Sequence, residues 1–136
     1  MNQPLVSDHE RILNQSGINE AQLIGQYLYT NNYHPSHIIS STATRTIETA
    51  KIINRKINFN NKVETQSLIY NKSIIEILNL INNIDNQYNC VMLIGHNPTI
   101  TQLINEISNT NIDYMPTCGT SVIDFQCEWN LIDKNG

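Results

Sequence analysis

The sequence is poor in basic residues: 8 lysines and arginines stand against 12 acidic residues, for a formal net charge of -4. The basic residues form no cluster, which excludes the positively charged surface that nucleic-acid binding requires. No apolar run approaches the ~20 residues of a membrane-spanning helix, and the N-terminus lacks the pattern of a signal peptide. We therefore expect a cytoplasmic protein with neither a nucleic-acid nor a membrane partner.

Residues that could bind a metal or act as a thiol nucleophile are also scarce. Cys90, Cys118 and Cys127 are odd in number and lack metal-ligand spacing, so reduced thiols are expected. A phosphatase loop built on Cys118 would need an arginine soon after it, and none follows. His34 and His37 straddle a proline without a third ligand. We expect no metal and no cofactor.

The 136 residues are 40 % apolar, which is enough for one core, and we expect a single domain over 1–136. The chain opens with an irregular stretch and a helix rather than a strand, and His9 falls in a polar segment expected at the surface. Apolar periodicity predicts helices over 17–30, 43–53, 73–84 and 98–109, a strand or extended segment over 63–70, and strands over 38–40, 90–94 and 121–129. Strands that alternate with helices indicate a layered α/β fold.

One histidine stands where an apolar run ends, in "LIGHNPTI". The run over 90–94 suits a strand buried on both faces, and Gly95 permits a tight turn. Asn97 is a good N-cap and Pro98 a good first helical residue. His96 would then face the N-terminus of a helix, which is a favourable place for an anion. Alternatively, His96 merely satisfies a carbonyl of the turn.

A second strand-to-helix turn occurs in "HIISSTATRTIETAKII". Ser41 or Thr42 can cap the helix after the strand over 38–40, which puts Arg45 in the first helical turn. A cation there is unfavourable beside the helix dipole unless an anion is bound, and a guanidinium can hold phosphate bidentately. The alternative is a solvated surface arginine.

The two turns should open at the same edge of one parallel sheet. Open α/β sheets bind their ligands at the carboxyl ends of the strands. We therefore predict that Arg45 and His96 converge on one phosphate, with Asn97 as a further binding residue. On this prediction Arg45 and His96 are the catalytic candidates.

Several segments together resemble the histidine phosphatase superfamily. "SSTATRTIETA" and "GHNP" are similar to its arginine motif and its second histidine motif. "SDHERILNQSG", "LIYNKSIIEIL" and "MPTCGTSVIDF" resemble segments of the small SixA-type phosphohistidine phosphatases. The resemblance implies a phosphoglycerate mutase-like, three-layer αβα fold with a mainly parallel sheet. It also implies that Arg45 clamps the phosphoryl oxygens and that His96 stabilises charge during transfer.

The family's nucleophile has no counterpart in the sequence. It is a histidine in an Arg-His-Gly motif that ends the first strand, and no Arg-His pair occurs anywhere in this chain. His9 follows an aspartate and lacks a preceding apolar strand, so it does not match the nucleophile. Ile12 and Ser16 also depart from the family's proline and arginine. We expect an N-terminally truncated domain that lacks the first strand; a rearranged sheet is the alternative.

The resemblance implies a phosphomonoesterase that removes phosphate from phosphorylated protein histidine through a phosphohistidine intermediate. The substrate would be a phosphorylated protein or a small phosphate ester, and no metal would be needed. A carboxylate such as Glu64 could serve as a general acid, but we expect Glu64 to be a surface residue. The alternative function is a non-catalytic module that binds phosphate or a phosphoprotein. A nucleophilic histidine would distinguish the two.

Overall fold

The computed structural model describes residues 8–59, 62–71, 73–112 and 120–133. Helices and strands alternate along this part of the chain, and no strand precedes residue 37 within it. In chain order the elements are η1 (Asp8–Glu10), α1 (Gln15–Thr30), β1 (His37–Ser40), α2 (Thr44–Ile57), β2 (Glu64–Thr65), α3 (Leu68–Asn71), α4 (Ile74–Asn82), β3 (Val91–Ile94), α5 (Thr99–Ser108) and η2 (Trp129–Leu131).

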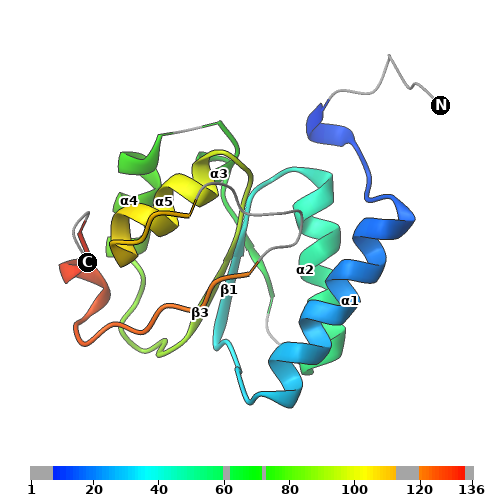
Figure 1. Ribbon diagram of the computed structural model, residues 1–136, viewed down its shortest axis with the longest axis horizontal. Helices are drawn as coiled ribbons and strands as arrows, with labels where there is room; N and C mark the ends of the chain where they lie inside the picture. Colours follow the sequence, from blue (N-terminus) through cyan, green and yellow to red (C-terminus); the bar gives the residue numbers. More distant parts are fainter. Residues whose placement is uncertain (1–7, 60–61, 72, 113–119, 134–136) are drawn as a thin grey trace.

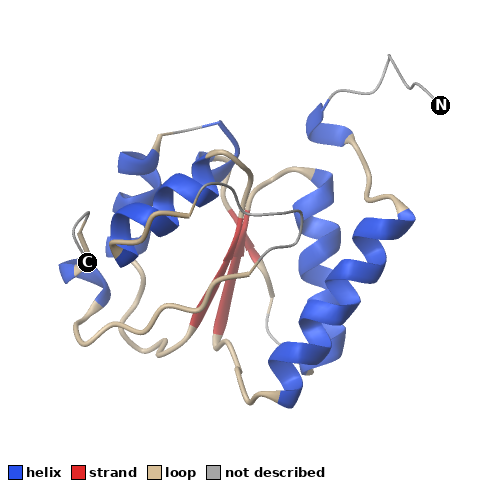
Figure 2. Cartoon of the chain, viewed as in Figure 1, coloured by secondary structure: helices blue, strands red, loops and turns tan. Residues whose placement is uncertain are grey.

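The sheet contains three strands in the order β2-β1-β3, and both pairings are parallel. Figure 1 shows α1 and α2 on one face of this sheet and α3, α4 and α5 on the other. The same three layers are clear in Figure 2, where the strands run between the two groups of helices. The predicted three-layer α/β fold with a parallel sheet is therefore confirmed.

Two hydrophobic clusters hold the layers together. On one face of the sheet Ile38 packs with residues of α1 and α2, and on the other α4, α5 and the C-terminal segment share a cluster. β1 is the central strand, and Ile38 and Ile39 are only 0 % and 1 % exposed. The members of the two clusters are Leu28, Ile38, Ile53 and Ile57, and Ile77, Ile81, Leu103, Ile107 and Ile132.

Helix α1 packs closely against α2. The predicted face of α1 is confirmed, because Ala21 and Leu28 are buried and Ile24 packs on the core. The helix begins two residues earlier than predicted because the Asn14 side chain accepts a hydrogen bond from the Gly17 amide at 2.8 Å. At Gly25 the two backbones approach so closely that a Cβ would lie 2.6 Å from the Cβ of Lys56.

The strand predicted over 121–129 is not formed. Residues 120–128 are irregular and lead into η2. Their alternating pattern still buries apolar groups, since Ile123 and Phe125 pack against the α4–α5 cluster, and Trp129 donates from Nε1 to the Tyr88 carbonyl at 2.8 Å. Alternation thus indicated one apolar face correctly, but a strand also needs a hydrogen-bonding neighbour.

Strand β3 occupies an edge of the described sheet. All four of its residues are half-buried, so the prediction of burial on both faces is wrong. Its side chains nevertheless alternate between the two layers, because Met92 and Ile94 pack toward the α1–α2 cluster and Leu93 toward the α4–α5 cluster. The reduced burial follows from its position, since β3 pairs only with β1.

Helix α2 continues to Ile57, four residues beyond its predicted end, and the segment over 63–70 forms β2 only at Glu64–Thr65 before turning into α3. Ser73 occupies the N-cap position of α4 as predicted, although its hydroxyl makes no capping bond. The short helix α3 was not predicted. Among the described helices, none is both long enough and apolar enough to cross a bilayer.

Candidate functional site

The two strand-to-helix turns meet at the carboxyl end of the sheet. β1 and β3 end in register, with Ser40 opposite Ile94, and the Ser41 amide donates to the Ile94 carbonyl at 3.0 Å. This pairing brings the residues that follow each strand together: His96 Nε2 lies 2.6 Å from Ser41 Oγ. The predicted convergence of the two turns is therefore present in the backbone and in this side-chain contact.

The hydroxyl of Ser41 fixes the imidazole of His96. Thr46 Oγ1 lies 2.9 Å from the Ala43 carbonyl, 3.1 Å from the Ser41 carbonyl and 2.7 Å from Ser41 Oγ, and either hydroxyl can donate in the contact between them. The Ala43 amide donates to Ser41 Oγ at 3.2 Å. Ser41 has only one proton, so it donates either to Thr46 Oγ1 or to His96 Nε2. When it donates to Nε2, a neutral His96 carries its own proton on Nδ1.

Arg45 lies in the first turn of α2, as predicted, and its side chain is half-buried. The helix has Ala43 at its N-cap, with no capping side chain among the described residues. The predicted caps are wrong because both hydroxyls are engaged elsewhere. Ser41 serves His96 and Thr46, and Thr42 bonds His9.

Helix α5 begins at Thr99 with Pro98 at its N-cap, one residue later than predicted. Asn97 is therefore not the N-cap; the Asn97–Pro98 peptide is cis, and Asn97 Oδ1 accepts from the Thr101 hydroxyl at 2.6 Å. Neither α2 nor α5 has a side-chain cap in the described structure, and both start beside the same sheet edge. Their first-turn amides and dipoles favour an anion there.

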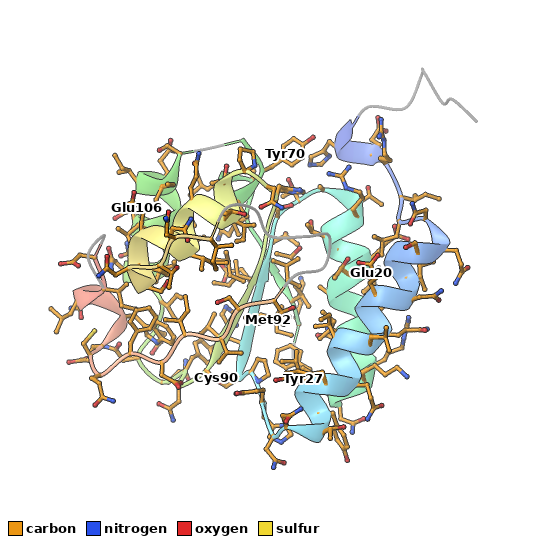
Figure 3. The ribbon with its side chains drawn as sticks, in the orientation of Figure 1. Glu20, Tyr27, Tyr70, Cys90, Met92 and Glu106 are labelled. Atoms are coloured by element: carbon orange, nitrogen blue, oxygen red, sulfur yellow. The ribbon has the colours of Figure 1, made fainter. Side chains whose placement is uncertain are left out.

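Sequence reasoning missed two aromatic neighbours of this site, His9 and Tyr70. His9 is half-buried rather than exposed, and its Nε2 lies 2.8 Å from Thr42 Oγ1. The ring of Tyr70 is 4.8 Å from that of His9 and 5.0 Å from that of His96, both edge-on. Figure 3 shows Tyr70 projecting from α3 toward η1. No local pattern could reveal these contacts, because they join segments far apart in the chain.

Glu64 belongs to a different cluster. Its carboxylate accepts from Gln66 and pairs with His37 Nε2 at 2.7 Å, and the His37 ring stacks on Tyr88 at 4.4 Å. The hydrogen bond from Gln66 lowers the pKa of Glu64 below its ordinary value of 4.5; burial opposes this shift, and the bond and charge of His37 add to it. Glu64 is half-buried rather than freely exposed, and its carboxylate bonds Gln66 and His37 rather than facing His96 or Arg45 in any described contact.

The other candidate ligands stay apart. Among the described residues, no group of three or more His, Cys, Asp or Glu side chains could hold a metal ion. Cys90 and Cys127 are free thiols, and burial followed by the charge of Asp124 raises the pKa of Cys90. Cys118 lies outside the described residues.

Comparison with known proteins places this geometry in a family. The family model for the histidine phosphatase superfamily (branch 1) matches residues 4–69. The structure of a candidate phosphohistidine phosphatase SixA from Agrobacterium tumefaciens is 31% identical, with a TM-score of 0.72, over 79% of this chain and 68% of that one. A SixA candidate from Nakamurella multipartitia is 26% identical, with a TM-score of 0.65, over 77% and 59%.

Two further relatives match most of this chain. An uncharacterised protein of Mycobacterium leprae is 26% identical over 137 residues, 94% of this chain and 83% of that protein. The structure of the protein histidine phosphatase SixA complexed with tungstate is 18% identical with a TM-score of 0.71, and it shows a shared fold. The chain belongs to the histidine phosphatase superfamily, where it is similar to the SixA phosphohistidine phosphatases and shares their phosphoglycerate mutase-like fold.

Proposed function

We propose that this chain forms the phosphate-binding part of a phosphohistidine phosphatase-like phosphomonoesterase, which removes phosphate from phosphorylated protein histidine. The observation that carries the proposal is the contact between the two turns. His96 is held by Ser41 at 2.6 Å, four residues before Arg45 in the same turn. The names of the SixA relatives support the substrate class.

Each side chain has a role that follows from its chemistry. The Arg45 guanidinium binds two phosphoryl oxygens, and His96 donates a hydrogen bond where charge develops during transfer. The amides at the start of α2 and α5 add fixed partial positive charge. Asn97 supplies a polar amide at the rim, oriented by Thr101. An imidazole leaves phosphorus readily, so the reaction does not depend on a carboxylic acid such as Glu64.

Phosphoryl transfer also needs a nucleophilic histidine, and no Arg-His pair occurs in these 136 residues. We propose that a further strand, which would add in parallel to the outer edge of β3, supplies this histidine. That edge is the natural place, because a strand ending beside His96 would deliver its last residue to the same phosphate. The phosphoryl group would pass from substrate to this histidine and then to water.

Phosphate binding tests the proposed site directly. Isothermal titration of the 136-residue chain with orthophosphate should give an affinity that falls about 10- to 100-fold in Arg45→Ala, since hydrogen bonds to charged groups are worth ~1.5–3 kcal/mol. His96→Ala should also weaken binding. The matched control is Arg55→Ala, which removes an exposed arginine from the last turn of the same helix. Equal affinity in the Arg45 and Arg55 variants would overturn the assignment.

Two further measurements concern the nucleophile. The intact mass of the protein isolated from its own cells should exceed 15.5 kDa by a segment that carries a strand and an Arg-His pair. The 136-residue chain should not hydrolyse phosphohistidine. Turnover by this chain that requires His9 would identify His9 as the nucleophile and contradict the conclusion that His9 does not match the family's nucleophilic histidine. A native mass of 15.5 kDa with phosphate binding alone would indicate a binding module.

A further inference from the structure

Two histidines from distant parts of the chain contact the ring of one tyrosine. His9, in η1, and His96, after β3, both meet the Tyr70 ring edge-on, with interplanar angles of 86° and 88°. Consecutive hydroxyls of the turn after β1 contact the two imidazoles, Ser41 with His96 at 2.6 Å and Thr42 with His9 at 2.8 Å. Arg45 lies three residues after Thr42, in the first turn of α2.

We propose that His9 is a second imidazole of the phosphate site and binds the phosphoryl group of the substrate together with His96. The inference rests on the proposed function, because it assumes that the anion lies beside Arg45 and His96. It assigns to His9 a binding role that is separate from nucleophilic attack.

The hydrogen bonding of His9 suits this role. Its Nε2 contacts Thr42, and Nδ1 makes no hydrogen bond to the described residues. When the Thr42 hydroxyl donates to Nε2, a neutral imidazole carries its proton on Nδ1 and can donate it to an anion. If His9 served only to attach η1 to the turn after β1, a hydrogen bond through one ring nitrogen would be enough. Packing against Tyr70 restricts the ring, which lowers the entropy lost when a ligand binds.

Imidazole resonances of the unsubstituted chain provide the first test. The sequence has 4 histidines, so each ring can be followed separately in a ¹⁵N-histidine sample titrated with orthophosphate. His9 and His96 should shift along one binding curve, while the exposed His34 and the Glu64-paired His37 remain unchanged. A shift of His96 without His9 would overturn this inference and leave the proposed function standing. No shift in either ring would contradict both.

Substitutions then measure the contribution of His9. His9→Ala should weaken orthophosphate binding on the order of tenfold, as expected for one charge-assisted hydrogen bond. Thr42→Val, which removes the hydroxyl that orients the ring, should weaken it less. His34→Ala is the control, because His34 is exposed and its ring contacts that of Tyr29, at a distance from the two turns in the chain. A His9 variant that keeps full affinity would refute the proposal, and if that variant unfolds, the titration of the unsubstituted chain decides.

Discussion

Replacing Ser41 by alanine would remove the atom that joins the two halves of the site. Ser41 is 0 % exposed, and its Oγ contacts the Ala43 amide, Thr46 Oγ1 and His96 Nε2. The substitution deletes the acceptor of the Ala43 amide and the hydrogen-bonding partner of His96 Nε2. Thr46 loses little, because its own hydroxyl can donate to backbone carbonyls.

The loss of unfolding free energy depends on how far the Ala43 amide and the His96 ring are buried once Ser41 Oγ is removed. The Ala43 amide is buried at 0 % exposure, so losing its acceptor costs ~1–3 kcal/mol. His96 is half-buried and can turn toward water, so its stability term is smaller. We expect Ser41→Ala to lower the free energy of unfolding by about 2 kcal/mol. Phosphate affinity should also fall about fivefold, the value of one neutral hydrogen bond that orients the ring.

The neighbouring residue provides a matched control. Ser40 is equally buried, but its hydroxyl makes one bond, to the Ser41 carbonyl at 2.9 Å, and Thr46 also donates to that carbonyl. Ser40→Ala should therefore cost only ~0.5–1.5 kcal/mol and leave phosphate binding unchanged. Urea unfolding and isothermal titration with orthophosphate measure the two effects. Equal destabilisation and equal phosphate affinity in both variants would refute the reasoning, because the hydrogen bonds of Ser41 Oγ would then not orient His96.

Three other perturbations test the fold and its titrating groups. Gly25→Ala should lower the unfolding free energy by about 1 kcal/mol, because a clash with Lys56 at 2.6 Å outweighs the gain in helix propensity. A variant that is more stable in urea would show that α1 and α2 can move apart without loss of packing. Glu64 has a lowered pKa when folded, so its contribution is present above 4.5 and disappears as the pH falls through the folded pKa. Glu64→Gln should thus lower the free energy of unfolding by less than about 1 kcal/mol at pH 7, because the Glu64 side chain is 37% exposed, and should not change it in acid. A stability difference between the two proteins that grew as the pH fell would contradict the lowered pKa. Iodoacetamide should label exposed Cys127 before Cys90, whose pKa is raised by burial, as peptide mass spectrometry can follow; faster labelling of Cys90 would be inconsistent with that environment.

Local patterns in the sequence were enough to predict the framework of the site. The apolar runs before Ser40 and Gly95 indicated β1 and β3, and the helical periodicity that follows each run indicated α2 and α5. Parallel strands that end in register bring their following turns together. The contact between those turns was therefore foreseeable from residue types and spacing alone.

Other features depended on neighbours that no local pattern contains. The alternating segment over 121–129 has the composition of a strand but lacks a strand partner in the described sheet, so it packs its apolar face as a loop. Ser41 and Thr42 are good caps by type, yet their hydroxyls bond His96 and His9 instead. Cap and strand propensities are worth ~1 kcal/mol each, which tertiary contacts easily exceed.

The position of His9 shows most clearly which features follow from local sequence and which depend on tertiary contacts. By itself the sequence determined the longer helices, the strands β1 and β3, and the side chains that follow these strands, Arg45 and His96. Only the tertiary structure decided that His9 and Tyr70 join them, since the contact of His9 with Thr42 spans 33 positions. Secondary structure follows from spacings within a few residues, whereas a binding site is assembled by long-range packing that brings separate segments to one sheet edge.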